Sequence, residues 1–237
     1  NGAATPIVVN ALNGSGTVKT GGGITVGIDN GSGSFSGIIE NSSDGGSAFS
    51  ITKGGSGTQT LSGANTYTGG TTLTGTGTLV LEDVNAAGTG SIIQTDANSI
   101  LRFDTTGTIT NSMTLYNFES LRNVTLSGDI NAQDATYKIA TGKDTILSGD
   151  ITGTGKLSQI GADDANYRGT LTLSGDNNFE GDTEVGSVLN VGSATALSAQ
   201  SKLKVNNDGM VKLNGFDSTV AALESGPQGG GVIEGSA

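Results

Sequence analysis

The chain of 237 residues contains no cysteine, no histidine and no tryptophan. Without cysteine it can form no disulfide and has no thiol chemistry. Without histidine or cysteine it lacks the ligands of the usual zinc sites, and a serine nucleophile would have no histidine base. We therefore expect neither a zinc enzyme nor a serine or cysteine hydrolase.

Positive charge and long apolar runs are also scarce. The chain has 11 Lys and Arg against 22 Asp and Glu, a net charge of -11 and a pI of about 4.2, which argues against nucleic acid and anionic membranes as partners. No run of 18 apolar residues predicts a transmembrane helix. The opening stretch NGAATPIVVNALNG has neither a basic start nor an apolar segment. We expect no signal peptide and regard the chain as a piece of a longer protein.

Glycine is abundant, at 41 residues, whereas apolar residues make up only 33%. Globular domains usually contain about 45–50% apolar residues. A packed structure is possible here only if almost every apolar residue faces inward and small polar residues cover the surface. A thin, continuous core satisfies this constraint better than a spherical one.

The hydrophobic period is two over most of the chain, which is typical of strands. Alternation is clear in residues 17–29, 99–105, 170–176 and 202–215. In residues 99–105 it places Leu101 and Phe103 on one face and Ile100, Arg102 and Asp104 on the other. Helical spacing is scarce, and residues 193–203 fit a turn of helix or a loop equally well. The sequence predicts an all-β fold.

Repeat spacing indicates which β architecture is present. LSGDI occurs at 126–130 and again at 147–151, and a longer LSGxN unit starts at Leu61 and again at Leu173, a distance of about five such repeats. Repeats of roughly 20–24 residues are typical of solenoids. We expect a parallel β-helix of about ten to twelve rungs and about 50 Å length. The Asn-Gly and Asp-Gly pairs, which could mark hairpins of a β-sandwich, are also suitable for solenoid corners.

The stretch from Leu61 to Leu81 is expected to form one rung. We predict that Leu61, Leu73, Leu79 and Leu81 point inward and that the TYTGGT corner points outward. Its threonines would then form outward polar ladders; they are Thr66, Thr68, Thr71, Thr72, Thr74, Thr76 and Thr78. Tyr67 and Phe179, which occupy matching positions in the two LSGxN copies, are predicted to pack inward or against a corner.

Residues 51–81, ITKGGSGTQTLSGANTYTGGTTLTGTGTLVL, resemble the passenger-associated repeat of Gram-negative autotransporters, the type V secretion proteins. The second copy, at residues 173–185, has Phe179 in place of Tyr67 and Asp182 in place of Gly70. The tail at 211–237 is also similar, because LNGF-x-x-TV commonly follows such a repeat. Together these parts cover about a third of the chain.

The resemblance implies a right-handed parallel β-helix passenger on the bacterial cell surface, carried there by a C-terminal outer-membrane β-barrel. No such barrel strands are visible, so we expect residues 1–237 to be a single β-helix passenger fragment with repeat units near 51–83 and 165–197. Its only link to the membrane would be that missing barrel. Members of this group are most often adhesins or self-association proteins, and a minority carry protease or esterase domains.

The acidic pair Asp163 and Asp164, close to Arg168, is the sharpest catalytic candidate. Inverting glycoside hydrolysis needs two carboxyl groups about 6.5–9.5 Å apart, but neighbouring strand residues point to opposite faces. The Asp pair resembles the clustered carboxylates of secreted β-helix enzymes that cleave pectin-like polysaccharides. That resemblance also implies a histidine near the site, and this chain has no histidine. A solvated loop is the favoured interpretation, and a calcium site is the alternative. The glycine-rich stretches at 20–27 and around Gly75 and Gly77 are interpreted as corners, because neither has the features of a phosphate-binding loop.

Three functions follow as hypotheses. The first is a non-enzymatic adhesin that acts through one face of the rod in autoaggregation and biofilm formation; its partner is a second rod, or a host surface protein or glycan. The second is a structural stalk or autochaperone-like segment that supports secretion and folding. The third is a β-helix enzyme that degrades polysaccharides. We predict no catalytic, cofactor-binding or metal-binding residue and no cofactor.

Overall fold

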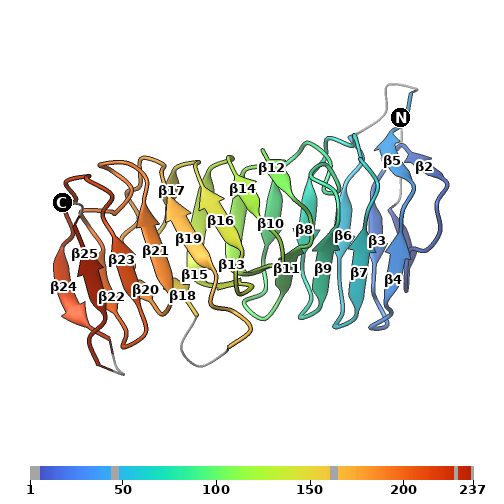
Figure 1. Cartoon of the computed structure of the whole chain (residues 1–237). Helices are drawn as coiled ribbons and strands as arrows, with labels where there is room; N and C mark the ends of the chain where they lie inside the picture. The colour runs from blue at the N-terminus through green and yellow to red at the C-terminus, as the bar shows by residue number, and fades with distance from the viewer. Residues whose placement is uncertain (1–5, 44–47, 161–164, 227–228, 236–237) are drawn as a thin grey trace.

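The computed structural model describes residues 6–43, 48–160, 165–226 and 229–235. These residues contain 25 strands and no helix, so none of them forms a helix able to span a membrane. The strands stack as successive turns of a rod (Figure 1). The predicted all-β fold and parallel solenoid architecture are confirmed, with about ten turns.

The strands form three sheets, and every pairing between them is parallel. The long sheet contains β1 (Ile7–Val9), β3 (Ile24–Val26), β4 (Gly33–Phe35), β6 (Ile51–Lys53), β7 (Thr58–Leu61), β8 (Thr71–Leu73), β9 (Thr78–Leu81), β10 (Ile92–Gln94), β11 (Ile100–Phe103), β13 (Met113–Ser120), β15 (Ile130–Ile139), β17 (Ile151–Thr152), β18 (Leu157–Gln159), β20 (Thr183–Val185), β22 (Lys202–Val205) and β24 (Ala222–Ser225). The second sheet contains β12 (Gly107–Ile109), β14 (Val124–Leu126), β16 (Asp144–Leu147), β19 (Thr170–Leu173), β21 (Val188–Val191), β23 (Met210–Lys212) and β25 (Val232–Glu234). The third pairs β2 (Thr17–Thr20) with β5 (Ile38–Asn41).

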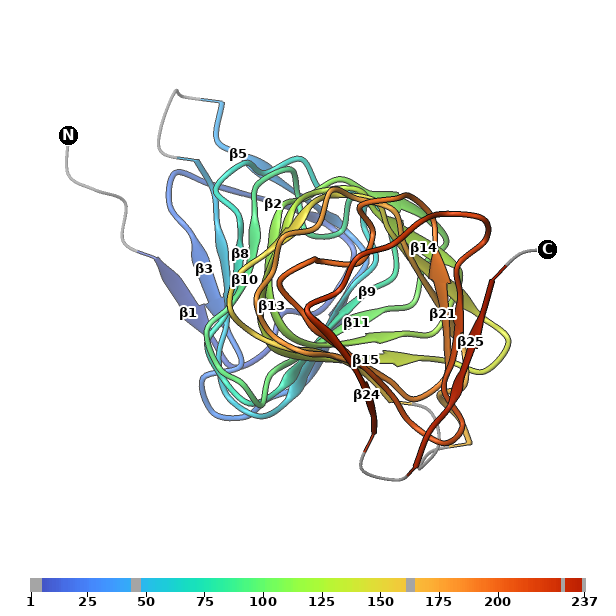
Figure 2. The same ribbon diagram turned by 90° about the vertical axis from the view of Figure 1, so that its left-hand side faces the viewer.

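The registers confirm the repeat lengths read from the sequence. Leu126 pairs with Leu147 and Ile130 with Ile151, so the two LSGDI segments lie in adjacent rungs. The strands that end the two longer copies, β8 with Thr71 and β20 with Thr183, lie five pairings apart, but Thr71 aligns with Ile130 of β15 and Thr183 with Ala135. The view along the rod shows these turns winding around a common interior (Figure 2).

One apolar cluster fills this interior from Ile24 to Val211. The predicted inward positions are confirmed, because Leu61, Leu73, Leu79 and Leu81 are each at most 1% exposed. Aromatic rings of neighbouring rungs also stack in the interior: Phe118 pairs with Tyr137, and their ring centroids lie 4.4 Å apart. In the segment 193–203, for which helix and loop were both left open, residues 193–201 form turns that bury Ala196 and Leu197, and β22 begins at Lys202.

The corners need residues that tolerate unusual backbone geometry. Asn30 and Asn214 have φ of 62° and 51°, a left-handed conformation that Asn adopts more readily than most residues. Asn-Gly pairs at corners are thereby confirmed at these two sites, whereas Asp44–Gly45 lies outside the described residues. The alternating run 202–215 is divided into β22 and β23 by a turn at residues 206–209.

In three of the four LSG motifs the glycine lies directly over a glycine of the preceding rung, and in the fourth Gly128 lies over Asn111. A Cβ on Gly63 would overlap the carbonyl oxygen of Gly37, and one on Gly175 would overlap that of Gly149. Gly149 itself lies in the same way over Gly128. The motif therefore requires glycine because two backbones approach too closely at this corner for any side chain.

We predict that Gly63→Ala lowers the free energy of unfolding by about 1–3 kcal/mol, since the added methyl group has to displace backbone. The matched control is Gly16→Ala, because a Cβ on Gly16 would meet no atom within 4 Å. Urea unfolding followed by circular dichroism measures both. Equal midpoints for the two variants would show that the glycine column is not a steric requirement.

Candidate functional site

Of the three residues singled out in the sequence as a catalytic candidate, Asp163 and Asp164 lie outside the described residues. The guanidinium of Arg168 lies 3.4 Å from the carboxylate of Asp208, in an ion pair with both side chains more than 40% exposed. Among the residues that the structure describes, no group of three or more His, Cys, Asp or Glu could hold a metal ion. The glycine-rich stretch with Gly75 and Gly77 is the corner between β8 and β9, as predicted.

The LSGxN motif places a buried asparagine between three rungs. In the first copy, the Asn65 side chain accepts a hydrogen bond from the backbone N–H of Ile39 at 2.8 Å and donates one to the carbonyl of Ala86 at 2.6 Å. In the second copy, Asn177 makes the same two bonds, to Ile151 and Ala196. The conserved geometry of the two copies gives the motif a physical function, which is to tie the rungs before and after its own.

Sequence reasoning missed this asparagine, although its recurrence four residues after each leucine was visible. The period-two pattern treats a polar residue as outward. Asn65 is instead 1% exposed, because a strand that ends at the corner leaves backbone groups that an amide can satisfy.

The aromatic residue of the motif packs inward, as predicted for Tyr67 and Phe179, which are both fully buried. The outward orientation predicted for the TYTGGT corner is wrong at three positions, Tyr67, Gly70 and Thr71, which are all buried. Thr71 is 1% exposed, donates to the carbonyl of Ala87 at 3.1 Å and lies 2.5 Å from the Tyr67 hydroxyl. Since Thr71 uses its own hydrogen for Ala87, Tyr67 is the donor of the bond between the two hydroxyl groups.

The second copy compensates for the missing hydroxyl of Phe179. Thr183, the counterpart of Thr71, forms its hydrogen bond with Ser201 Oγ at 2.9 Å instead. The remaining threonines of the predicted ladder, Thr66, Thr68, Thr72, Thr74, Thr76 and Thr78, are exposed or partly exposed.

Long polar side chains also satisfy corners from inside the rod. Lys53 is 1% exposed, and its ammonium donates to the carbonyls of Gly54 at 2.6 Å and Gly55 at 3.5 Å. Burial lowers the pKa of the Lys53 ammonium. Gln94, at the same end of β10, donates to Ser99 and Asn117 and accepts from Tyr116. The Lys-Gly-Gly turn is therefore a corner held by its own lysine rather than a binding loop.

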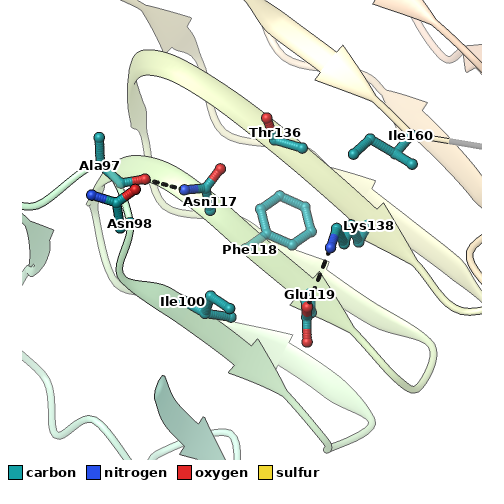
Figure 3. A pocket seen from close by; sticks show the side chains of 9 residues that line it. All are labelled: Ala97, Asn98, Ile100, Asn117, Phe118, Glu119, Thr136, Lys138 and Ile160. Atoms are coloured by element: carbon teal, nitrogen blue, oxygen red, sulfur yellow. Dashed lines mark hydrogen bonds and ion pairs between the residues drawn. The ribbon is translucent and has the colours of Figure 1, made fainter. Parts of the chain in front are cut away.

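A shallow depression of about 350 Å³ lies on the outer face of the long sheet (Figure 3). Ile100, Asn117 and Thr136 cross it in register, and Glu119 and Lys138 form a second row beside them. The Asn117 amide donates to the carbonyl of Ala97 at its edge. The other lining residues are Asn98, Phe118 and Ile160.

The same outer face carries an unusual share of the positive charge. Among the described residues between β11 and β24, ion pairs on this face join five of the eleven basic residues to four of the 22 acidic ones. The pairs are Arg102 to Glu119 at 2.6 Å, Lys138 to Glu119 at 3.9 Å, Lys156 to Glu184 at 3.7 Å, Lys204 to Asp182 at 2.6 Å and Lys202 to Glu224 at 3.3 Å. We call these nine residues the charged face. It is almost neutral on a strongly acidic rod.

Comparison with known proteins identifies the repeated segments. A family model described as the passenger-associated-transport-repeat matches residues 51–81 and 168–187. The first range contains β6 to β9, and the second contains β19 and β20 with the Asn177 motif between them. No curated protein and no solved structure gives a significant match.

We predict that Asn65→Asp lowers the free energy of unfolding by about 2–4 kcal/mol, because it replaces a buried donor by an oxygen that faces the carbonyl of Ala86. The matched control is Asn30→Asp. Among the described residues, the Asn30 side chain bonds only through its carbonyl, which accepts from the N–H of Ser56 at 2.9 Å on the surface, and aspartate keeps that acceptor. Urea unfolding compares the two variants. A control as unstable as Asn65→Asp would contradict the three-rung role of Asn65.

A second pair of variants separates two buried tyrosines. Tyr67→Phe should lower the free energy of unfolding by about 1 kcal/mol, because the bond to Thr71 is lost. Tyr137→Phe should leave it unchanged or raise it, because the Tyr137 hydroxyl has no hydrogen-bond partner among the described residues. The reverse order in thermal or urea unfolding would contradict this assignment.

The same tyrosines predict an alkaline limit to stability. Burial raises the pKa of both Tyr67 and Tyr137 well above the ordinary value near 10. Above pH 10 the unfolded chain releases these protons and the folded chain retains them, so stability falls by about 1.4 kcal/mol per pH unit for each tyrosine. In each Phe variant the free energy of unfolding should fall less steeply with pH between pH 10 and 11. An unchanged slope would contradict the raised pKa of the tyrosine that was replaced.

Proposed function

We propose that this chain, whose passenger-associated transport repeats and β-solenoid fold fit the passenger domain of an autotransporter, is an adhesin or self-association protein that acts through the outer face of its rod. The repeat family implies a secreted, cell-surface passenger. As part of the same proposal, the full-length protein is anchored in the outer membrane and takes part in autoaggregation and biofilm formation.

The observation that carries the proposal is the distribution of charge. The chain has a net charge of -11, so two rods repel each other over most of their surfaces. The charged face has five cations and four carboxylates, and on this face the repulsion is replaced by attraction between local opposite charges. A second acidic rod therefore approaches this face at the least electrostatic cost.

The length of the rod allows many weak contacts to form at once, so the total binding free energy can be large although each contact contributes little. An exposed ion pair contributes only about 0.2–1 kcal/mol, and it is weakened by salt. The charged face extends over the seven rungs from β11 to β24, so several such contacts form at once. A host surface protein or glycan bound at the depression beside Ile100 and Lys138 is the alternative partner within this proposal.

The solenoid and its repeat family suggest a structural or adhesive role, and we propose no catalytic activity. A stalk or autochaperone-like function is the second candidate. It is favoured by Asn65 and Asn177, which are buried and hydrogen-bond to the rungs before and after their own. In this case the repeats would serve secretion and folding of the passenger rather than binding.

We predict that cells displaying the chain settle from suspension faster than control cells, and that the purified chain forms concentration-dependent dimers in sedimentation equilibrium. Both effects should weaken as salt rises from 50 to 500 mM, because ion pairs on an open face are screened. If neither effect occurs, and deletion of residues 51–81 only reduces surface yield, the stalk function replaces adhesion.

A further inference from the structure

We propose that two copies of this chain pair antiparallel through their charged faces, with β18 of one copy opposite β18 of its partner. The proposal rests on the self-association proposed above and adds the orientation and register of the pair. It is argued from the order of charges along the rod.

The first half of the charged face lies on β11, β13 and β15. Arg102, Glu119 and Lys138 occupy one register position on these three strands, so their side chains follow one another along the rod. Glu119 lies between the two cations, and its side chain is only 7% exposed, against 32% and 34% for Arg102 and Lys138. This half therefore presents a net positive surface.

The second half lies on β20, β22 and β24. Glu184, Lys204 and Glu224 share one register position on these strands. Asp182 and Lys202 flank them, so three carboxylates and two ammonium groups give this half a net negative charge. Between the halves, β18 contributes the uncharged Ser158 at the same register position as Glu184.

The order of signs is inverted about β18. In the first half it runs positive, negative, positive from Arg102 to Lys138, and in the second it runs negative, positive, negative from Glu184 to Glu224. In an antiparallel pair centred on β18, Lys138 meets the partner's Glu184. Glu119 then lies opposite the partner's Lys204, and Arg102 opposite the partner's Glu224. Every one of these contacts joins opposite charges, and the two-fold symmetry forms each of them twice.

A parallel pair in the same register would place each of these charges over its own copy. All six rungs would then bring like charges together, which is repulsive. The order of charges thus favours one orientation and disfavours the other, which is the requirement for specificity.

The geometry of the face is compatible with this pairing. The first set of charges is displaced by one pleat, about 7 Å along the strand, from the second set. The opposite charges of the pair are therefore offset by this distance, which is below the Debye length of about 8 Å at physiological ionic strength, so they attract one another across the contact. At the centre of the contact Ser158 of β18 lies opposite its own copy, and Lys156 beside it is directed to Glu184 of its own chain.

A charge-swap experiment tests the register. Lys138→Glu alone and Glu184→Lys alone each turn two attractive contacts into repulsive ones, so each should raise the dimer dissociation constant about tenfold in 50 mM salt. The double variant Lys138→Glu/Glu184→Lys restores both contacts and should return the constant to within about threefold of the original chain. Sedimentation equilibrium is the measurement.

The matched control is Lys212→Glu, which makes the same change in net charge on β23 of the second sheet. It should change the constant by less than threefold. Equal effects of Lys212→Glu and Lys138→Glu, or a double variant no better than the single ones, would overturn the register while self-association itself stands. If the original chain is monomeric at all concentrations, both the self-association and the antiparallel register are overturned. Circular dichroism of each variant shows that its fold is retained.

Discussion

Stacking of backbone on backbone between successive turns is the constraint on which the rest of the structure depends. Parallel strands of neighbouring rungs exchange hydrogen bonds along the whole rod, so each turn must repeat the path of the one before it. Where the path bends, the carbonyl of one rung approaches the Cα of the next too closely for a side chain. The LSG glycines, such as Gly63 over Gly37, meet this condition.

Corners create a second requirement, because strands end there and leave backbone groups unpaired. The interior satisfies them with polar side chains that reach across rungs: Asn65 and Asn177 by their amides, and Lys53 by its ammonium. The core is therefore apolar along the strands and polar at the bends. This division explains why a chain with only 33% apolar residues forms a continuous interior.

The repeating interior leaves the outer faces free to vary, and on this chain the variation is electrostatic. Inward positions are constrained by packing, whereas outward positions on β11 to β24 carry arginine, lysine and glutamate in a particular order. A rod is well suited to binding by such a face, because small contributions from each rung add over its length. Adhesion and structural support are thus two uses of the same repeated unit.

Local pattern was enough to determine the architecture. Period-two alternation predicted that Leu101 and Phe103 share one face, which is buried, and the 21-residue spacing of LSGDI predicted a solenoid with stacked turns, because both depend only on strand geometry. The inward positions of Asn65 and Thr71 were not predictable in this way, since their partners, Ile39, Ala86 and Ala87, belong to other rungs. The charged face was not predictable from the sequence either, because Arg102, Lys138 and Glu184 are separated in the sequence by tens of residues. Only the register of the sheet, set by rung-to-rung hydrogen bonding, aligns them on one side of the rod.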